Sequence, residues 1–119
     1  MNGFFLVNKE YGDSSNFVVQ KIKKTFSFKK VGHLGTLDPA AEGLLIIAIN
    51  RATKFSNYFL NADKSYDVSV ELGISTNTDD ATGEVIYESQ NIPKKQKIIE
   101  EIQKFKGISM QKPPFFSAL

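Results

Sequence analysis

Apolar residues along the chain are spaced in two ways, and four segments show the pattern of β-strands. Residues 3–9, GFFLVNK, have high β-propensity and end in polar residues, which predicts a short buried strand. Residues 44–49, LLIIAI, are apolar at every position, which is typical of a central strand covered on both faces. Residues 65–73, SYDVSVELG, alternate between apolar and polar side chains, so one face, which includes Tyr66, is expected to be buried. Residues 84–89, EVIYES, follow a polar loop and predict a fourth strand.

Three other segments show the longer period of an α-helix. Val18, Ile22 and Phe26 recur at helical spacing. Residues 51–61 suit a short helix, and residues 94–107 predict a strongly amphipathic helix that covers the sheet. The inner sides of these two helices are expected to hold Ala52, Phe55 and Phe59, and Ile98, Ile99, Ile102 and Phe105. The candidate caps are Asp13, Ser14 and Ser15 for the first helix and Gly107 for the last. The order of elements predicts an α+β fold with a mixed, largely antiparallel sheet flanked by helices.

Composition narrows the class of protein. The 119 residues are 41% hydrophobic and 24% charged, which is typical of a globular chain, and the length suits a single unit. The absence of cysteine excludes thiol nucleophiles, thiolate metal sites and disulfides. The longest apolar run has six residues, far below the roughly 20 that a membrane helix needs, and the N-terminus lacks the basic region of a signal peptide. We therefore expect a cytoplasmic protein without a membrane partner.

The net charge of +2 does not by itself indicate binding to nucleic acid. Basic residues gather at positions 21–30 and 94–106, and these clusters are most simply solvated helix faces, although the first could also hold phosphates. Every basic residue except Arg51 is a lysine. Only one residue, Arg51, can therefore bind a phosphate or carboxylate in the bidentate way of a guanidinium group.

The segment VGHLGTLDPAAEGLLIIAI, residues 31–49, contains the only histidine, three glycines and an Asp-Pro pair a few residues before the apolar strand. An Asp-Pro pair often does nothing more than start a turn, and the glycines can simply supply positive φ angles. A glycine-rich loop beside a rigid buried strand is also where functional groups tend to lie. Asp38 is therefore the candidate for chemistry.

Other kinds of site fit the sequence less well. His33 has no serine in a Gly-x-Ser-x-Gly turn to activate. One histidine and no cysteine leave only oxygen ligands, and residues 77–84, NTDDATGE, lack the glycine position and acidic spacing of a calcium loop, so no metal is expected. Glu42 is the only carboxylate near Asp38 in sequence, which is a poor basis for a glycosidase pair. A lone, partly desolvated carboxylate can still act as a nucleophile or a general base.

Three motifs resemble one known family. GHLGTLDPAAEGLLIIAINRATKF closely resembles the catalytic motif of the TruB family of tRNA pseudouridine synthases, and FLNADKSYDVSVELGISTNTDDATGEV resembles the family's next block. QKPPFFSAL is similar to the family's later Gln-x-Pro-Pro-x-aromatic-Ser-Ala segment. The three motifs occur in order over nearly the whole chain. The resemblance implies that residues 1–119 are the N-terminal portion of a pseudouridine synthase catalytic domain.

The resemblance also implies an activity, the conversion of uridine to pseudouridine at position 55 in the T-loop of tRNA. In this reaction the bond from uracil N1 to ribose C1′ breaks, the base turns, and C5 joins C1′. No cofactor is needed, because the released base is itself the second reactant. Asp38 would be the catalytic aspartate. The resemblance leaves open whether its carboxylate attacks the sugar, attacks the base, or removes a proton to give a glycal.

Further residues match the family's substrate-binding positions. Tyr66 matches the tyrosine that lies against the target base, and His33 matches the histidine that contacts RNA where the T-loop is opened. Gly35 and Leu37 belong to the same loop motif and are expected to contact substrate, and Lys64 could hold a phosphate. Judged without the resemblance, Tyr66 would be a core residue and His33 a loop histidine with no special role.

The sequence departs from the family pattern in two places. Asn77 stands where the family usually has an aspartate, which concerns the loop more than the chemistry. The chain stops at Leu119, so the arginine that pairs with the catalytic aspartate, the rest of the domain and the C-terminal RNA-binding module are expected to be absent, and Arg51 is not placed to replace that arginine. We therefore expect a fragment that is inactive alone and a full-length monomer. The alternative is a non-catalytic RNA-binding or RNA-chaperone module.

Overall fold

The computed structural model describes residues 1–110, so the QKPPFFSAL motif lies outside the described residues. The chain divides into two compact units, Met1–Tyr66 and Asp67–Leu119. The buried hydrophobic residues of the described part all belong to the first unit and are Val18, Val19, Leu34, Leu45, Ile47, Ala48, Ile49 and Ala52. The first unit therefore has a hydrophobic core of its own.

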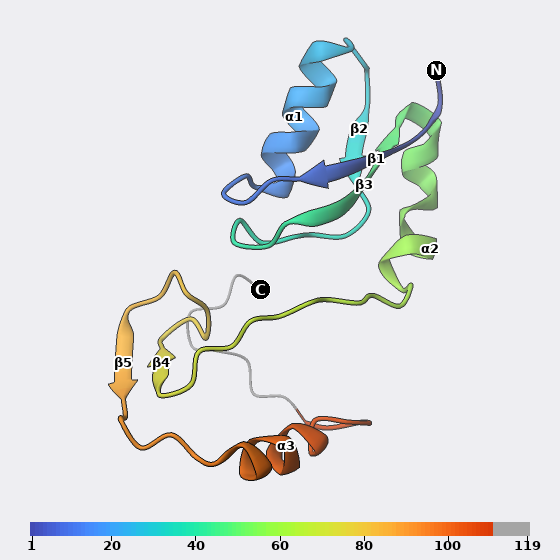
Figure 1. Cartoon of the computed structure of the whole chain (residues 1–119). Helices are drawn as coiled ribbons and strands as arrows, with labels where there is room; N and C mark the ends of the chain where they lie inside the picture. The colour runs from blue at the N-terminus through green and yellow to red at the C-terminus, as the bar shows by residue number, and fades with distance from the viewer. Residues whose placement is uncertain (111–119) are drawn as a thin grey trace. The chain divides into compact units, whose positions relative to one another are not determined.

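The first unit is built on a three-stranded antiparallel sheet (Figure 1). The strand order is β1 (Gly3–Lys9), β3 (Gly43–Ile49) and β2 (Val31–His33). Both neighbours pair with β3, which is therefore the central strand, as its uninterrupted apolar sequence predicts. The predicted strand at residues 3–9 is confirmed as β1, but it lies at an edge of this sheet and is not fully buried, since Phe4 and Leu6 are exposed.

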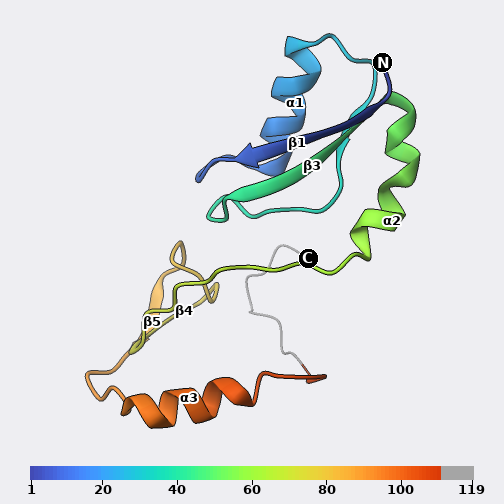
Figure 2. The same cartoon turned by 45° about the vertical axis from the view of Figure 1, so that its right-hand side comes forward.

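Helix α1 (Ser15–Thr25) covers one face of this sheet (Figures 1 and 2). It begins after Ser14, whose hydroxyl oxygen accepts a hydrogen bond of 3.0 Å from the backbone N–H of Phe17, so the predicted cap is confirmed. The buried residues that join the helix to β3 are Val18, Val19, Leu45 and Ile47. Phe26 remains half-exposed, and its ring stacks on that of Phe28 at a centroid distance of 5.6 Å.

The opposite face of β3 is covered by a 3-10 turn, η1 (Asn50–Phe55), that runs directly into helix α2 (Ser56–Leu60). The second cluster of apolar side chains consists of Leu34, Ala48 and Ala52, with Ile46 and Phe59 packed against them. Ala52 and Phe59 thus face inward as predicted. The prediction for Phe55 was wrong, because its side chain is 52% exposed and packs against the ring of Tyr58 instead.

The second unit contains a hairpin of β4 (Ile74–Thr76) and β5 (Val85–Glu88), followed by helix α3 (Lys95–Gln103). The hairpin turn is organised by Asp80, whose carboxylate accepts hydrogen bonds from the Thr78 hydroxyl and from both the hydroxyl and the backbone N–H of Thr82. The prediction that Gly107 caps this helix was wrong, because the backbone N–H groups of Lys104 and Phe105 donate to the carbonyls of Glu101 and Ile102, and Lys104 is the C-cap. Gly107, with a φ of +88°, lies three residues beyond that cap.

Two other predictions for this part of the chain were also wrong. Residues 63–71 form neither helix nor strand, and Val68 and Val70 are 75% and 74% exposed, although their alternation predicts a strand with one buried face. Alternation marks the faces of a strand but does not supply the neighbouring strand that it must pair with. No residue of α3 is buried, so within residues 1–110 its apolar stripe does not cover a sheet. The predicted α+β class with a largely antiparallel sheet is nevertheless confirmed. No helix among residues 1–110 has the length and apolar character needed to cross a membrane.

Candidate functional site

The candidate site is the loop between β2 and β3, residues 34–42. The loop leaves the sheet at Leu34, whose backbone N–H donates to the Ile46 carbonyl at 2.8 Å and whose side chain is buried. Gly35 and Gly43, near its two ends, have φ angles of +121° and +113°. Side chains with a Cβ rarely adopt such angles, so glycine at these two positions lets the loop turn away from the sheet and return to it.

Asp38 lies at the exposed tip of this loop. Its backbone carbonyl accepts from the Ala41 N–H at 3.0 Å, so the turn expected of an Asp-Pro pair is present. Among residues 1–110 no side-chain hydrogen bond or ion pair engages the Asp38 carboxylate. The carboxylate is therefore presented to solvent and is not used to stabilise the turn.

Both residues that flank Asp38 are held by the start of α1 and the segment that precedes it. The Ser15 hydroxyl donates to the Leu37 carbonyl at 2.8 Å and accepts from the Leu37 N–H at 2.9 Å. On the other side, the Pro39 carbonyl accepts from the Gly12 N–H at 2.7 Å. The exposed Asp38 carboxylate thus belongs to a backbone that hydrogen bonds hold at the residues immediately before and after it.

Lys9 adds a buried cation beneath this arrangement. Its side chain is only 1% exposed, and Nζ donates to the carbonyl oxygens of Asp13 at 2.7 Å and Glu10 at 3.0 Å, with Pro39 at 3.5 Å. A buried ammonium group needs such partners, because burying an unpaired charge is very costly. Lys9 therefore ties the end of β1 to the residues just beyond it and to the loop of Asp38.

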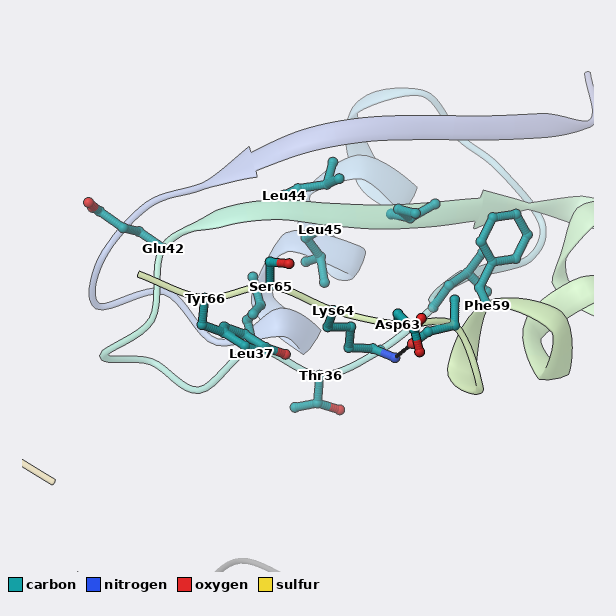
Figure 3. Close-up of a pocket in the computed structure, with 14 residues that line it drawn as sticks. Thr36, Leu37, Glu42, Leu44, Leu45, Phe59, Asp63, Lys64, Ser65 and Tyr66 are labelled. Carbon is teal, nitrogen blue, oxygen red and sulfur yellow. Dashed lines mark hydrogen bonds between the residues drawn. The ribbon is translucent and has the colours of Figure 1, made fainter. Parts of the chain in front are cut away.

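A pocket of about 280 Å³ lies beside the loop (Figure 3). This volume is close to the roughly 300 Å³ at the lower end of pockets for drug-sized ligands, so the pocket has room for one flat ring. Its apolar lining is Leu34, Leu37, Leu44, Leu45, Ile46, Phe59 and Ala62. Its polar lining comes from Thr36, Glu42, Asp63, Lys64, Ser65 and Tyr66.

Four of the six predicted site residues, namely Gly35, Leu37, Lys64 and Tyr66, line this pocket. Asp38 does not line it, but it directly follows Leu37, which does. Tyr66 is 61% exposed and belongs to no strand, so it is available to a ligand and is not the core residue that its alternating segment predicts.

His33 lies at the end of β2 and does not line the pocket. Its Nδ1 is 2.8 Å from the Gly35 carbonyl oxygen. A carbonyl can only accept a hydrogen bond, so Nδ1 carries the proton and, in the neutral ring, Nε2 is left as the acceptor. The histidine thus braces the first turn of the loop and keeps its second nitrogen for another partner.

The ammonium group of Lys64 makes hydrogen bonds within the protein, whereas contact with a phosphate would require the same donors. Its ammonium donates to the carbonyls of Ala62 at 2.7 Å (Figure 3) and Leu60 at 3.0 Å, at the end of α2. Its Cε would lie 3.9 Å from a Cβ added to Gly35, so the aliphatic stem packs beside the loop. A phosphate would have to compete with both carbonyl groups for this ammonium.

The lysines at positions 21–30 form the main basic region of the first unit. All five are exposed, and residues 14–37 contain no aspartate or glutamate. A positively charged surface of this kind attracts phosphate backbones without reading sequence. The only ion pairs among residues 1–110 join Glu101 to Lys97 and Lys104 on α3, so they leave these lysines unneutralised.

Sequence patterns did not identify the roles of Lys9 and Ser15. The position of Ser15 before an apolar helical pattern indicates only a helix cap, a role that Ser14 fills. A lysine at the last position of an apolar strand is the one local signal for Lys9, and it does not indicate which carbonyl groups the ammonium will meet. Both residues act on partners that are brought close only by the fold.

Comparisons with known proteins agree with the motif resemblance. Residues 23–119 match the model of the TruB family pseudouridylate synthase (N terminal domain). The chain is 50% identical over its full length to tRNA pseudouridine synthase B of Blochmanniella floridana and 46% identical to that of Histophilus somni (strain 2336), and it spans 47% and 39% of those proteins. Among solved structures, a chain of a Cbf5-Nop10-Gar1 complex superposes on 98% of this chain with a TM-score of 0.65 and 27% identity, and 30% of that chain is covered.

The chain thus spans less than half the length of the curated relatives that it matches. The family model nevertheless covers most of the sequence, including the loop of Asp38 and the pocket beside it. The chain belongs to the TruB family of pseudouridylate synthases.

Proposed function

We propose that the protein to which this chain belongs converts uridine to pseudouridine at position 55, in the T-loop of tRNA, with Asp38 as its catalytic carboxylate. The observation that carries the proposal is the position of Asp38 in a loop whose preceding residues line a pocket with room for one base. The 50% identity to tRNA pseudouridine synthase B of Blochmanniella floridana supports the choice of reaction and of tRNA as substrate.

The pocket suits a single base that has left the RNA stack. Apolar side chains such as Phe59 and Leu37 offer a surface to a flat ring, and Tyr66 can lie against it. In the proposed reaction the bond from N1 to C1′ breaks and a bond from C5 to C1′ forms. The proton on C5 is released and N1 gains one, so the product is an isomer of the substrate and no cofactor is consumed. Asp38 would assist as a nucleophile or a base.

The remaining expectations belong to the same proposal. The T-arm of tRNA would be held by His33 near the opened loop and by phosphate contacts from the lysines at 21–30. We further propose that the full-length enzyme is a cytoplasmic monomer. The 1–119 segment would supply the N-terminal portion of the catalytic domain, which agrees with its match to the N-terminal domain of the family.

One observation favours a second function for this chain on its own, that of a non-catalytic RNA-binding or RNA-chaperone module. Within the described residues the Asp38 carboxylate has no cationic partner. Arg51, the only arginine, has its backbone N–H bonded to the Asn2 side chain and does not line the pocket. A chain whose carboxylate lacks an electrostatic partner can still bind RNA in its pocket and yet fail to catalyse the reaction.

The test is release of tritium from C5-labelled uridine in a T-arm RNA. Two proteins are compared, this chain and a chimera in which it replaces the matching segment of the Blochmanniella floridana synthase. We expect the chimera to release tritium and its Asp38→Asn variant to lose about 10²–10⁴-fold in rate. Asp79→Asn makes the same charge change at an exposed turn residue and should be silent.

The outcomes separate the two functions. If Asp38→Asn retains the rate of the parent chimera, Asp38 is not the catalytic residue. If the chimera is folded and binds the T-arm RNA but releases no tritium, the RNA-binding module is the better account. Release by the 119-residue chain alone would show that the pocket and Asp38 are sufficient without the rest of the enzyme.

A further inference from the structure

We infer that Ser15 is a positioning residue for Asp38, an inference that rests on the proposed function and assigns a new role within it. Ser15 is the first residue of α1 and is only 3% exposed. Its hydroxyl both donates to the carbonyl of Leu37 at 2.8 Å and accepts from the N–H of the same residue at 2.9 Å. One side chain therefore satisfies both polar backbone groups of the residue directly before Asp38.

This double hydrogen bond resembles the pairing between neighbouring β-strands, in which one residue exchanges both of its backbone hydrogen bonds with a partner. It restrains Leu37 more strongly than one bond would, because rotation about either bond breaks the other. The restraint acts between residues 22 positions apart in the chain. Ser15 thus joins the N-terminal end of a rigid helix to the loop that carries Asp38.

The burial of Val18 and Val19 explains why Ser15 is a suitable anchor. These two side chains hold α1 against β3 one turn beyond Ser15, so the start of the helix is fixed relative to the sheet. Ser14 caps the helix through the Phe17 N–H, which leaves the Ser15 hydroxyl free for the loop. The two adjacent serines therefore have separate tasks.

The position of Asp38 matters because its own side chain has no hydrogen bond within residues 1–110 to hold it. A catalytic group must be held close to its reacting geometry, and a displacement of about 1 Å can cost on the order of 100-fold in rate. Leu37 also lines the pocket, so a shift of this residue would disturb the base and the carboxylate together. Ser15 touches neither of them and acts only through the Leu37 backbone.

The experiment compares Ser15→Ala, Ser15→Thr and Ser14→Ala in the chimera described above. Ser15→Ala removes both hydrogen bonds, whereas Ser15→Thr retains the hydroxyl. Ser14→Ala is the matched control, because it makes the same change at the next residue and weakens the helix without touching the loop. We expect Ser15→Ala to lower kcat about 10- to 100-fold with KM changed less than about threefold. Ser15→Thr and Ser14→Ala should stay within about fivefold of the parent kcat.

A second measurement does not depend on activity. Exchange of the Leu37 amide hydrogen, followed by NMR in this chain, reports directly on the bond from Leu37 to Ser15. We expect Ser15→Ala to accelerate this exchange at least about tenfold and Ser14→Ala to leave it within about threefold. If Ser15→Ala does not fold, Ser15→Cys provides the same comparison, since its thiol has nearly the same shape and bonds weakly.

The inference is overturned if Ser15→Ala retains the parent kcat, if Ser14→Ala lowers kcat equally, or if exchange of the Leu37 amide does not change. An inactive parent chimera would instead count against the proposed function, and the effect of Ser15 on kcat would then have no basis. In that case the exchange measurement alone decides whether Ser15 holds the loop. The two ideas can therefore fail separately.

Discussion

The ammonium group of Lys9 lies 2.7 Å from the carbonyl oxygen of Asp13, inside the protein and away from solvent. This contact joins the two ends of the short connection between β1 and α1. The same ammonium also reaches toward the Pro39 carbonyl, 30 residues further along the chain. One cation thus links the first strand, the start of the first helix and the loop of Asp38.

Replacing Lys9 by methionine should therefore destabilise the first unit. The aliphatic part of the side chain is retained, but the hydrogen bonds from the charged group to the backbone carbonyls are lost. Bonds of this type contribute about 1.5–3 kcal/mol to stability, so the free energy of unfolding should fall by about that amount. Urea unfolding followed by circular dichroism measures the change.

The control for this prediction is Lys29→Met, the same substitution at an exposed loop position of the first unit. An exposed residue of this kind should change the free energy of unfolding by no more than about 0.5 kcal/mol. Equal effects of the two substitutions would mean that the buried position of Lys9 contributes nothing special.

Gly35→Ala should be destabilising through backbone strain alone. The φ angle of Gly35 is +121°, which a residue with a Cβ rarely adopts, while the nearest atom to an added Cβ is Lys64 Cε at an ordinary 3.9 Å. Strain of this kind costs about 1–3 kcal/mol. Gly3→Ala is the control, since Gly3 has open space around it and no such φ angle, and its stability should be unchanged or slightly raised. Thermal unfolding measures both variants: the melting temperature should fall for Gly35→Ala and should stay the same or rise slightly for Gly3→Ala.

Tyr66→Ala should weaken RNA binding with little effect on stability. Tyr66 is 61% exposed and lines the pocket, so its ring is available to stack on a base. Loss of one stacking partner costs about 1–3 kcal/mol, which is roughly 5- to 150-fold in Kd. Tyr66→Phe keeps the ring and should stay within about threefold. Fluorescence anisotropy with a labelled T-arm RNA, in the Asp38→Asn background to prevent turnover, measures both.

The control for Tyr66 is Tyr58→Ala, which removes a more exposed ring that does not line the pocket. If Tyr58→Ala weakens RNA binding as much as Tyr66→Ala does, the pocket is not where the base is held.

The turn of the β4–β5 hairpin should weaken in acid. The side-chain hydrogen bond from Thr82, supported by that from Thr78, holds the pKa of the Asp80 carboxyl below its usual range. A carboxyl with a depressed pKa stabilises the folded turn above the unfolded pKa of about 3.9, and this contribution is lost as the pH falls through the lower folded value. NMR titration of the Asp80 carboxyl should show the lowered pKa, and Thr82→Val should raise it toward the ordinary value. An unchanged pKa in that variant would contradict the assignment of Thr82 as the main cause.

Periodicity in the sequence was sufficient to predict the strands at residues 3–9 and 44–49 and helix α1, with Ser14 as one of three candidate caps. The helix and its cap depend on contacts within a few residues, which a local pattern records, and the two strands pair with each other, so both patterns find a partner in the fold. The alternating residues 65–73 show the limit of this reasoning, because a strand also requires a partner that its own sequence does not specify.

The sequence by itself determined that a glycine-rich loop would present one carboxylate beside an apolar central strand, since glycine, proline and the apolar run act locally. Only the tertiary structure decided how that loop is held. The bonds from Ser15 to Leu37 and from Lys9 to Pro39 join residues 22 and 30 positions apart. The tertiary structure also decided that the Lys64 ammonium bonds to carbonyl groups at the end of α2 and that Tyr66 is exposed at the pocket. Hydrogen bonds of this kind depend on which segments the packed core brings together, and no local spacing of residue types encodes that.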